Sequence, residues 1–317
     1  MWIDRRVKPR WAGSATKRHG LVAWLWRLVV VHAELAKLRL TMLVVATTAA
    51  GYLLASSRPV PVAHLAITLL GTGLVAGAAN GLNQWLEVAR DRRMARTRGR
   101  PLADRRIGPV HAVAGAIVLG VLGAAILYRA VNPLSAAMAG AAAGVYLLLY
   151  TPLKTRSGFN LLIGAVVGAI PPMLGWAAAA GCLAPGAWAL GAVLFVWQIP
   201  HSLALGWLYR EQYARGGFRV LPVLDPDGRT TAAVSLLYAM ALLPSTVALT
   251  LIGTAGWMYG IGAVLLACWL VGVSVQLCRR RCDEAARRLF IASVVYLPLL
   301  LVIMVADRGP IAWGIFL

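Results

Sequence analysis

The chain has 317 residues, of which 60% are hydrophobic and only 13% are charged, with a mean hydropathy of +0.74. A soluble protein carries roughly a quarter charged residues, so this composition excludes a soluble globular class and indicates a polytopic membrane protein. The net charge of +20 does not indicate nucleic-acid binding, because the Lys and Arg residues lie in short segments between apolar stretches rather than in one basic domain.

The first part of the chain, residues 1–37, is predicted to be a cytoplasmic tail followed by an interfacial amphipathic segment from Leu21 to Lys37. Charged residues interrupt its apolar run and no small-residue cleavage site follows, so we do not expect a secretory signal peptide. From residue 38 to residue 317 we expect one transmembrane domain.

Nine apolar stretches follow, each long enough to cross about 30 Å of hydrocarbon as a helix of near 20 residues. Their length and the absence of an alternating pattern favour helices over strands. The predicted fold class is an all-α membrane protein, with nine transmembrane helices bundled around a central cavity that opens to the cytoplasmic side. The expected spans are 38–56, 64–89, 108–128, 133–150, 159–180, 186–208, 232–252, 256–277 and 287–306.

The distribution of basic residues predicts the orientation of these spans. Of the 31 Lys and Arg residues, 28 fall on the side of the N-terminal region and three fall on the other side. Basic residues are retained on the cytoplasmic side of membrane proteins, so the N-terminus is expected to be cytoplasmic and the C-terminus external.

The second span ends in a polar stripe formed by Asn83, Glu87 and Asp91. On a helix this i, i+4, i+8 spacing places the three side chains within roughly 80° of arc and over about 12 Å of its length. Carboxylate and amide oxygens suit Mg²⁺, which completes its coordination with waters and substrate phosphates. Such a stripe in a buried helix indicates a functional site, although a polar helix end that reaches the headgroups would show the same pattern.

Basic residues from two segments suit an anion beside this stripe. Arg96 and Arg100 follow it directly, and Lys154 lies in the segment Tyr150–Arg156 at the end of another span. A metal ion can bridge phosphate oxygens while arginine adds bidentate hydrogen bonds, so together these residues favour a diphosphate site. Taken singly, each basic residue is also explained by cytoplasmic topology or by anchoring at the headgroups.

A third segment, Trp197–His201, carries polar side chains inside an apolar span. Gln198 and His201 are therefore expected to face the bundle interior or a cavity. From the residues alone, His201 could ligate a haem iron or could merely cap a helix kinked by Pro200.

Three sequence blocks resemble a known family, in the same order along the chain. They are NQWLEVARDRRMARTRGRP, YTPLKTRSGFN with GAIPPMLGW, and WQIPHSLALGWLYREQYARGGFRVLP. They are similar to the signature blocks of the protohaem IX farnesyltransferases (haem O synthases), a branch of the UbiA-type intramembrane prenyltransferases. The resemblance runs from about Glu34 to Asp227, and nine helices are the architecture of that superfamily. The W-Q-x-P-H pattern is specific to the haem branch.

The resemblance implies transfer of a farnesyl group from farnesyl diphosphate to the 2-vinyl group of haem B with addition of water, giving haem O and diphosphate. It implies Mg²⁺ as cofactor, a cell (inner or cytoplasmic) membrane as location, and haem A synthase or terminal-oxidase assembly factors as candidate partners besides the substrates and lipid. The implied site residues are Asn83, Glu87 and Asp91 for Mg²⁺ and catalysis, Lys154 for catalysis and diphosphate, Arg96, Arg100, Tyr209 and Arg219 for diphosphate, Trp197, Gln198 and His201 for haem, and Glu211 for a second metal site.

The chain departs from the family pattern at two places. Gln212 stands where the family has a carboxylate before a tyrosine, so a second metal site would depend on Glu211, or on Asp225 and Asp227. Near the start, the family's Thr-Lys-Pro-Arg pattern is Ala-Lys-Leu-Arg at residues 36–39, which keeps both basic residues.

Two alternative functions remain open from the sequence. A quinone- or chlorophyll-type aromatic prenyltransferase would share the Mg²⁺–diphosphate stripe but not the W-Q-x-P-H pattern. A cation-coupled transporter could use the stripe as an ion path, although we find no inverted internal repeat and the charges gather at one end of the spans.

Overall fold

The computed structural model describes residues 21–308, so the predictions for the tail before residue 21 and for the C-terminal end lie outside the described residues. The described chain folds almost entirely into helices, with one isolated β-bridge between Ala255 and Arg308. The helices are α1 (Leu21–Leu35), α2 (Leu38–Ala55), α3 (Val62–Asp91), α4 (Pro109–Ala130), α5 (Pro133–Gly144), the π-helix η1 (Val145–Tyr150), α6 (Thr151–Leu153), α7 (Asn160–Ala180), α8 (Pro185–Leu208), α9 (Arg210–Arg215), α10 (Leu221–Leu224), α11 (Arg229–Leu251), α12 (Trp257–Arg280) and α13 (Asp283–Ala306).

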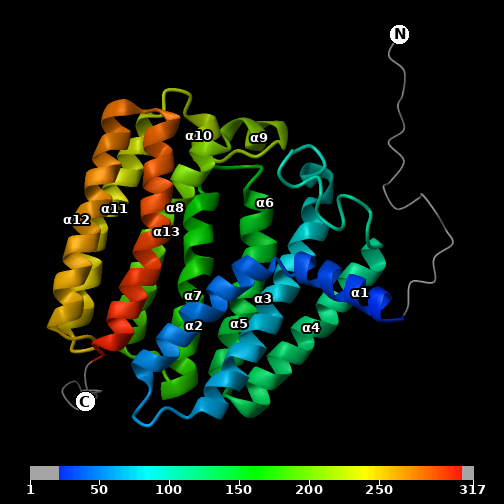
Figure 1. Ribbon diagram of the computed structural model, residues 1–317, viewed down its shortest axis with the longest axis horizontal. Helices are drawn as coiled ribbons and strands as arrows, with labels where there is room; N and C mark the ends of the chain where they lie inside the picture. Colours follow the sequence, from blue (N-terminus) through cyan, green and yellow to red (C-terminus); the bar gives the residue numbers. More distant parts are fainter. Residues whose placement is uncertain (1–20, 309–317) are drawn as a thin grey trace.

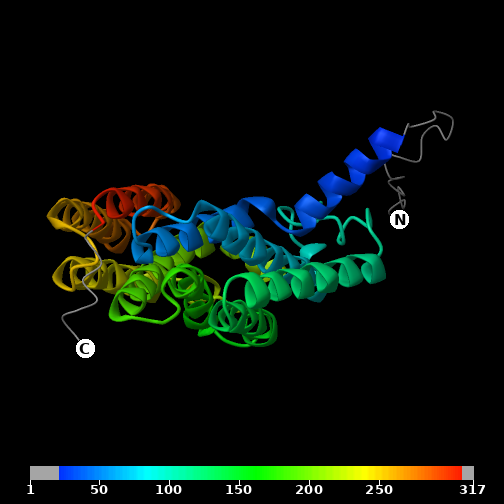
Figure 2. The same cartoon turned by 90° about the horizontal axis from the view of Figure 1, so that it is seen from below.

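Nine segments of the described chain are long and apolar enough to cross a membrane, which confirms the predicted all-α membrane class. Eight of them are the single helices α2, α3, α4, α7, α8, α11, α12 and α13, and one combines α5, η1 and α6. In Figure 1 these helices form a bundle, and the short helices α9 and α10 lie at its upper end. Helix α1 extends away from the bundle in Figure 2.

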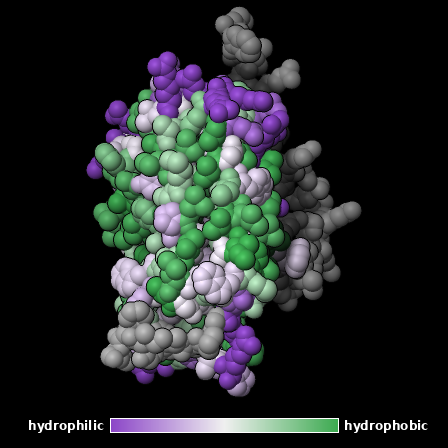
Figure 3. Space-filling view, turned by 90° about the vertical axis from the view of Figure 1, so that its left-hand side faces the viewer, coloured by the Kyte–Doolittle hydropathy of each residue, from purple (hydrophilic) through white to green (hydrophobic). Residues whose placement is uncertain are grey.

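The surface matches a bilayer environment. On the face drawn in Figure 3, hydrophobic residues fill the middle band and hydrophilic residues gather at its two ends. Helix α3 has 30 residues and is therefore about 45 Å long, which exceeds the roughly 30 Å of hydrocarbon that it must cross. Its last turns can thus lie beyond the hydrocarbon, and these are the turns that carry Glu87 and Asp91.

Helices α2 and α7 pack backbone against backbone because glycines face the contact from both sides. A Cβ atom on Gly51 would lie 1.9 Å from the carbonyl oxygen of Pro172, and one on Gly175 would lie 1.9 Å from that of Thr48. Lipid offers no hydrophobic driving force between helices, so small residues that allow close van der Waals contact are what stabilise such a pair.

Replacing Gly175 by alanine is therefore expected to force α2 and α7 apart and to destabilise the protein by about 1–3 kcal/mol. Thermal unfolding in detergent measures this change. Gly140→Ala is the matched control, because a Cβ atom at Gly140 would have no neighbour within 4 Å. Equal melting temperatures for the two variants would contradict the close packing.

A break between α1 and α2 places Lys37 beside α3. Lys37 has a left-handed backbone conformation (φ 48°), which interrupts the helix and turns its side chain inward. Two amides of α3 bind the carbonyl groups that the break leaves open, because Asn80 donates to Ala36 and Gln84 donates to Leu35 at 2.8 Å. The interruption is thus stabilised by side chains one and two turns away from Glu87.

The π-helix η1 has a local cause in the sequence. Pro152 follows it closely, and a proline ring collides with the carbonyl group four residues earlier in a regular α-helix. The wider π turn relieves that collision, and the N–H group of Thr151 donates to the carbonyl of Tyr146 instead. The same turn stacks the rings of Tyr146 and Tyr150, with centroids 5.6 Å apart.

Candidate active site

A cavity of about 480 Å³ lies within the helix bundle. Basic, acidic and tyrosine side chains gather in one part of its lining, whereas leucine, valine, alanine and glycine residues dominate the rest. The cavity brings together three segments that the sequence analysis singled out. Its polar lining includes Lys37, Asn80, Glu87, Asp91, Arg96, Arg100, Tyr146, Tyr150, Lys154, Gln198, His201, Ser202 and Tyr213.

Each member of the α3 stripe is paired with one basic side chain. Lys37 Nζ donates to Asn83 Oδ1 at 2.7 Å, and Lys154 Nζ donates to Glu87 Oε1 at 2.9 Å.

The third pair is bidentate, because Arg100 Nη1 lies 2.8 Å from both carboxylate oxygens of Asp91. The carboxylates of Glu87 and Asp91 are buried, with side chains only 5% and 1% exposed. Three basic side chains from different parts of the chain therefore offset the free-energy cost of burying the polar stripe.

The two lysines differ in charge behaviour, and both lie just outside the membrane-spanning helices. Burial, together with repulsion from Arg100 and Lys154, lowers the pKa of Lys37 to about 7. Burial also acts to lower the pKa of Lys154, but Tyr150 and Glu87 oppose it and raise that pKa above its ordinary value. Lys154 is thus a permanent positive charge at the cavity, whereas Lys37 loses its charge readily.

Arg96 is held at the cavity by aromatic rings rather than by a carboxylate. Its guanidinium lies 4.5 Å from the ring centroid of Tyr209 and donates to the Tyr213 hydroxyl at 3.1 Å. The side-chain oxygen of Gln212 accepts a hydrogen bond from the Arg96 backbone N–H at 3.2 Å. Tyr209 and Gln212 therefore position Arg96, and Arg96 keeps unpaired N–H groups for an anion.

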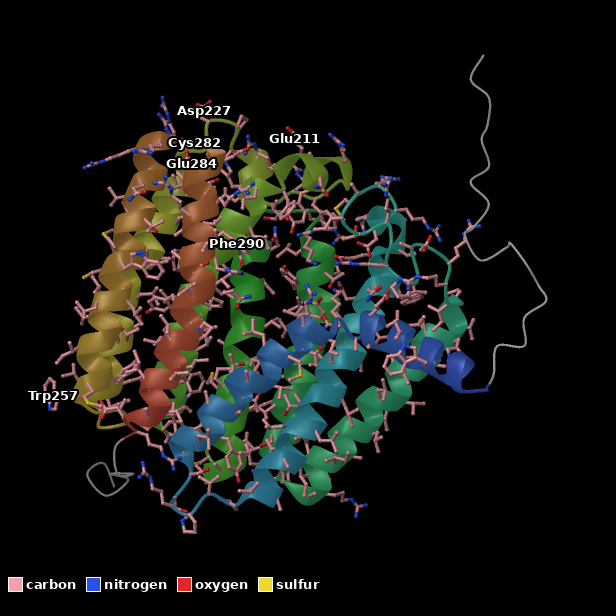
Figure 4. The ribbon with its side chains drawn as sticks, in the orientation of Figure 1. Glu211, Asp227, Trp257, Cys282, Glu284 and Phe290 are labelled. Carbon is pink, nitrogen blue, oxygen red and sulfur yellow. The ribbon has the colours of Figure 1, made fainter. Side chains whose placement is uncertain are left out.

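The structure does not bring every predicted residue into the cavity. Glu211 is 78% exposed and pairs with Arg215, and Figure 4 places it at the upper edge of the molecule, as it does Asp227. Asp225 accepts a hydrogen bond from the backbone N–H of Thr231 at the start of α11. No carboxylate from this loop lines the cavity, and neither does the exposed Arg219. Its backbone N–H donates to the Lys154 carbonyl.

A second polar group lies on α8, where His201 is held between two aromatic rings. Its ring stacks on Trp197 at 5.0 Å and lies 5.1 Å from Phe290, which projects from α13 toward α8 in Figure 4. His201 Nδ1 is 2.9 Å from the Ser293 hydroxyl, which itself donates to the Phe290 carbonyl. That hydroxyl can only accept from His201, so Nδ1 carries the hydrogen and Nε2 keeps a lone pair.

Gln198 reaches the cavity because α7 carries a glycine opposite to it. A Cβ atom on Gly168 would lie 1.7 Å from Gln198 Oε1, so a larger residue at this position would displace the end of the Gln198 side chain. Gln198 Nε2 donates to the carbonyl of Gly164 at 3.3 Å. Trp197, by contrast, uses its indole N–H on the carbonyl of Ser293 and offers only its ring.

The oxygen atoms of the α3 stripe suit a metal ion that is also bound by the phosphates of a substrate. The described residues contain no group of three or more His, Cys, Asp and Glu side chains that could hold a metal ion. The stripe supplies two carboxylates and one amide oxygen, and Mg²⁺ is commonly bound through one or two carboxylates together with substrate phosphates. The four surrounding basic residues outnumber the two carboxylates, which leaves positive charge for a diphosphate.

The sequence analysis missed several cavity residues. Lys37 was noted only as a surviving family residue, and Asn80, Tyr146 and Tyr213 were not assigned to the site. The spacing could have indicated two of them, because Asn80 lies one turn before Asn83 and two turns before Glu87 on α3, and Tyr146 lies four residues before Tyr150.

Two solved structures illustrate the fold that this chain shares with known proteins. A structure described as digeranylgeranylglyceryl phosphate synthase in membranes matches with a TM-score of 0.75 and 15% identity, over 88% of this chain and 98% of that one. A UbiA homolog from Archaeoglobus fulgidus bound to GPP and Mg²⁺ matches with a TM-score of 0.62 and 12% identity, over 86% and 99%. At these identities the likeness establishes the fold alone.

Sequence comparison gives much stronger similarity. The chain is 40% identical to the protoheme IX farnesyltransferase of Solibacter usitatus (strain Ellin6076), over 87% of this chain and 98% of the relative. It is 41% identical to the human mitochondrial protoheme IX farnesyltransferase, over 89% of this chain and 63% of that longer protein. The model of the UbiA prenyltransferase family matches residues 44–300. The chain therefore belongs to the UbiA prenyltransferase family.

Proposed function

We propose that this protein transfers a farnesyl group from farnesyl diphosphate to the 2-vinyl group of haem B with addition of water, giving haem O and diphosphate. One observation carries the proposal: a buried, cation-paired carboxylate stripe shares a single, largely apolar cavity with the Trp197–His201 block. The carboxylate stripe with its basic partners suits an isoprenoid diphosphate, and the Trp197–His201 block suits a large planar acceptor. Relatives with the same name at 40% identity support the assignment.

In this proposal Asn83, Glu87 and Asp91 would hold Mg²⁺ together with the diphosphate. A bound Mg²⁺ would supply positive charge where negative charge develops on the departing diphosphate. The solved Archaeoglobus fulgidus homolog is described with GPP and Mg²⁺, which supports a metal-dependent family reaction. Glu211 is left out of the metal site, because its exposed side chain pairs with Arg215.

The basic residues would bind and orient the diphosphate. Lys154 contacts Glu87 at 2.9 Å and Arg100 contacts Asp91 at 2.8 Å. Once a cation binds these carboxylates, both basic side chains can donate to phosphate oxygens instead. Arg96, which also lines the cavity, adds unpaired guanidinium N–H groups. These charges are placed before the reaction starts and stabilise the leaving group without rearrangement of solvent.

The apolar lining would protect the reaction from water. Leaving of the diphosphate produces positive charge on the allylic carbon, and premature hydrolysis is the competing reaction. The apolar part of the cavity lining includes residues such as Leu174, Leu194 and Val75, which carry no nucleophile. The stacked rings of Tyr146 and Tyr150 lie beside Lys154 and can face that developing charge.

We also propose a location and an orientation. The positive-inside pattern supports a cell membrane protein whose diphosphate end faces the cytoplasm, and the basic loop 92–108, α9 and α10 all lie at that end in Figure 1. Labelling of single-cysteine variants at Arg105 and at Arg58 with an impermeant reagent tests this. The reagent should reach residue 58 from outside the cell and residue 105 only after lysis, and the reverse result would invert the topology.

Replacing His201 by alanine is expected to abolish the shift of the haem Soret band on binding to the purified protein. The physical reason is that Ser293 leaves the Nε2 lone pair of His201 free at the cavity, where it can bind iron. His111→Ala is the control, because His111 is exposed on another helix. An unchanged spectrum in the His201 variant would return this histidine to a packing role between Trp197 and Phe290.

Acceptor-dependent release of diphosphate tests the proposed reaction. Purified protein in nanodiscs is supplied with farnesyl diphosphate and Mg²⁺, and diphosphate release is followed with haem B, with 4-hydroxybenzoate, or with no acceptor. Haem B should stimulate release, and chelation of Mg²⁺ should stop it. Stimulation by the aromatic acid alone would favour an aromatic prenyltransferase instead.

A further inference from the structure

Asn83 presents a problem that the two carboxylates of the stripe do not. A carboxylate offers oxygen atoms at both ends, whereas an amide offers one oxygen and one NH₂ group, and only the oxygen can bind a cation. Asn83 is fully buried, so no water corrects a wrong orientation of its amide. Asn83 does not itself line the cavity, so some neighbouring group must set whether its oxygen or its NH₂ group faces Lys37, which does.

A chain of hydrogen bonds from the π-helix sets this orientation. The hydroxyl of Thr151 donates to the carbonyl oxygen of Tyr146 at 2.7 Å, and a carbonyl can only accept. Its hydrogen is thereby committed, so the Thr151 oxygen accepts from Asn83 Nδ2 at 3.0 Å. At the other end of the amide, the Lys37 side chain donates to Asn83 Oδ1 at 2.7 Å. Both ends require the same orientation.

We propose that Thr151 is a positioning residue, which holds the Asn83 amide with its oxygen toward Lys37, where a bound cation would take the place of the ammonium group. This inference rests on the proposed function, because it assigns Asn83 as a metal ligand. Thr151 is 3% exposed and, like Asn83, is not part of the cavity lining, so it acts through Asn83, whose oxygen meets the cavity residue Lys37. Partners of this kind behind a metal ligand typically contribute 10- to 100-fold to metal affinity.

The fold explains why this hydroxyl is available. In a regular α-helix a threonine hydroxyl commonly bonds the carbonyl three or four residues earlier on its own helix. Here the π turn before Pro152 places the carbonyl of Tyr146, five residues back, under both the N–H and the hydroxyl of Thr151. The hydroxyl oxygen is left facing α3, where Asn83 lies. Pro152 thus causes the π turn, the π turn positions the Thr151 hydroxyl, and this hydroxyl orients the Asn83 amide.

Metal binding in the absence of turnover tests the proposal. Full-length protein in nanodiscs is titrated with Mn²⁺ in the presence of farnesyl thiodiphosphate, whose C–S bond resists cleavage, and free Mn²⁺ is measured by EPR. Thr151→Val keeps the shape but cannot accept from Asn83, and it should weaken Mn²⁺ binding roughly 10- to 100-fold. Thr151→Ser keeps the hydroxyl and should bind within about threefold of the unaltered protein.

Thr155→Val is the matched control. The Thr155 hydroxyl makes the same kind of bond, to the carbonyl of Pro152 at 3.0 Å, but the Asn83 amide bonds to Thr151 and not to Thr155. This variant should bind Mn²⁺ as the unaltered protein does. Unchanged binding in Thr151→Val, or equal losses in Thr151→Val and Thr151→Ser, would overturn the positioning role.

An Asn83→Asp background separates orientation from packing. Aspartate has two equivalent oxygens, so its orientation needs no support, and Thr151→Val should then cost less than about threefold in Mn²⁺ affinity. The same loss in both backgrounds would show that Thr151 only fills space. If the unaltered protein bound no Mn²⁺ with the analogue, the proposed metal site itself would fail, and that outcome is distinct from a failure at Thr151.

Discussion

Replacing Asp91 by asparagine is expected to lower farnesyl transfer by roughly two to three orders of magnitude while haem binding persists. The change keeps the size of the side chain but removes a charge that is 1% exposed and that meets Arg100 through both oxygens. The metal would lose one of its two carboxylates, and Arg100 would lose the partner that holds it in place. Single-turnover rates across a range of Mg²⁺ concentrations measure the loss.

The control for Asp91 lies in the basic loop that follows it, residues 92–108. Asp104 is exposed and contacts only Arg106, at 3.6 Å, so Asp104→Asn should leave the rate unchanged. The Soret shift of bound haem should be the same in both variants, because His201 lies on a different helix. Near-normal rates in Asp91→Asn at every Mg²⁺ concentration would remove the stripe from the metal site.

The second large effect is expected at Lys154. Lys154→Met leaves Glu87 buried without its 2.9 Å partner, and breaking a buried ion pair from one side typically costs about 3–5 kcal/mol of stability. The variant should therefore melt at a lower temperature and bind farnesyl diphosphate weakly. Thermal unfolding and analogue binding measure the two losses separately.

A double variant distinguishes the structural role of Lys154 from its chemical role. Glu87→Gln combined with Lys154→Met removes both charges, so much of the stability should return. Farnesyl transfer should stay lost, because neither the carboxylate nor the ammonium is available to the substrate. If the double variant regained activity together with stability, Lys154 would act only as the partner of Glu87. Arg156→Gln, at an exposed position two residues further on, is the neutral control.

The fold was largely predictable because it follows from hydrophobic length. The nine expected spans agree with the observed helices to within a few residues at most ends, since each apolar stretch must satisfy its own backbone hydrogen bonds in lipid. What the apolar pattern did not indicate is the π turn before Pro152, because its cause is a local clash within an apolar span. The interfacial placement of Leu21–Lys37 stays a prediction.

The site was predictable where its residues share one element. Asn83, Glu87 and Asp91 lie on one helix, so their spacing alone indicated a common face. Their partners come from other elements, and no spacing rule predicts that Lys37 meets Asn83 across 46 residues or that Lys154 meets Glu87 across 67. Glu211 was assigned on family resemblance, and the structure places it on the exposed side of α9, paired with Arg215 one helical turn away.

The identity of the product tests the central claim most directly. Purified protein is incubated with haem B, farnesyl diphosphate and Mg²⁺ in water enriched in ¹⁸O, and the haem fraction is analysed by chromatography and mass spectrometry. The proposed function predicts a more hydrophobic haem whose mass has increased by one farnesyl group and one hydroxyl group, with the added oxygen labelled. Unmodified haem, alongside farnesylated 4-hydroxybenzoate when that acid is supplied, would contradict it.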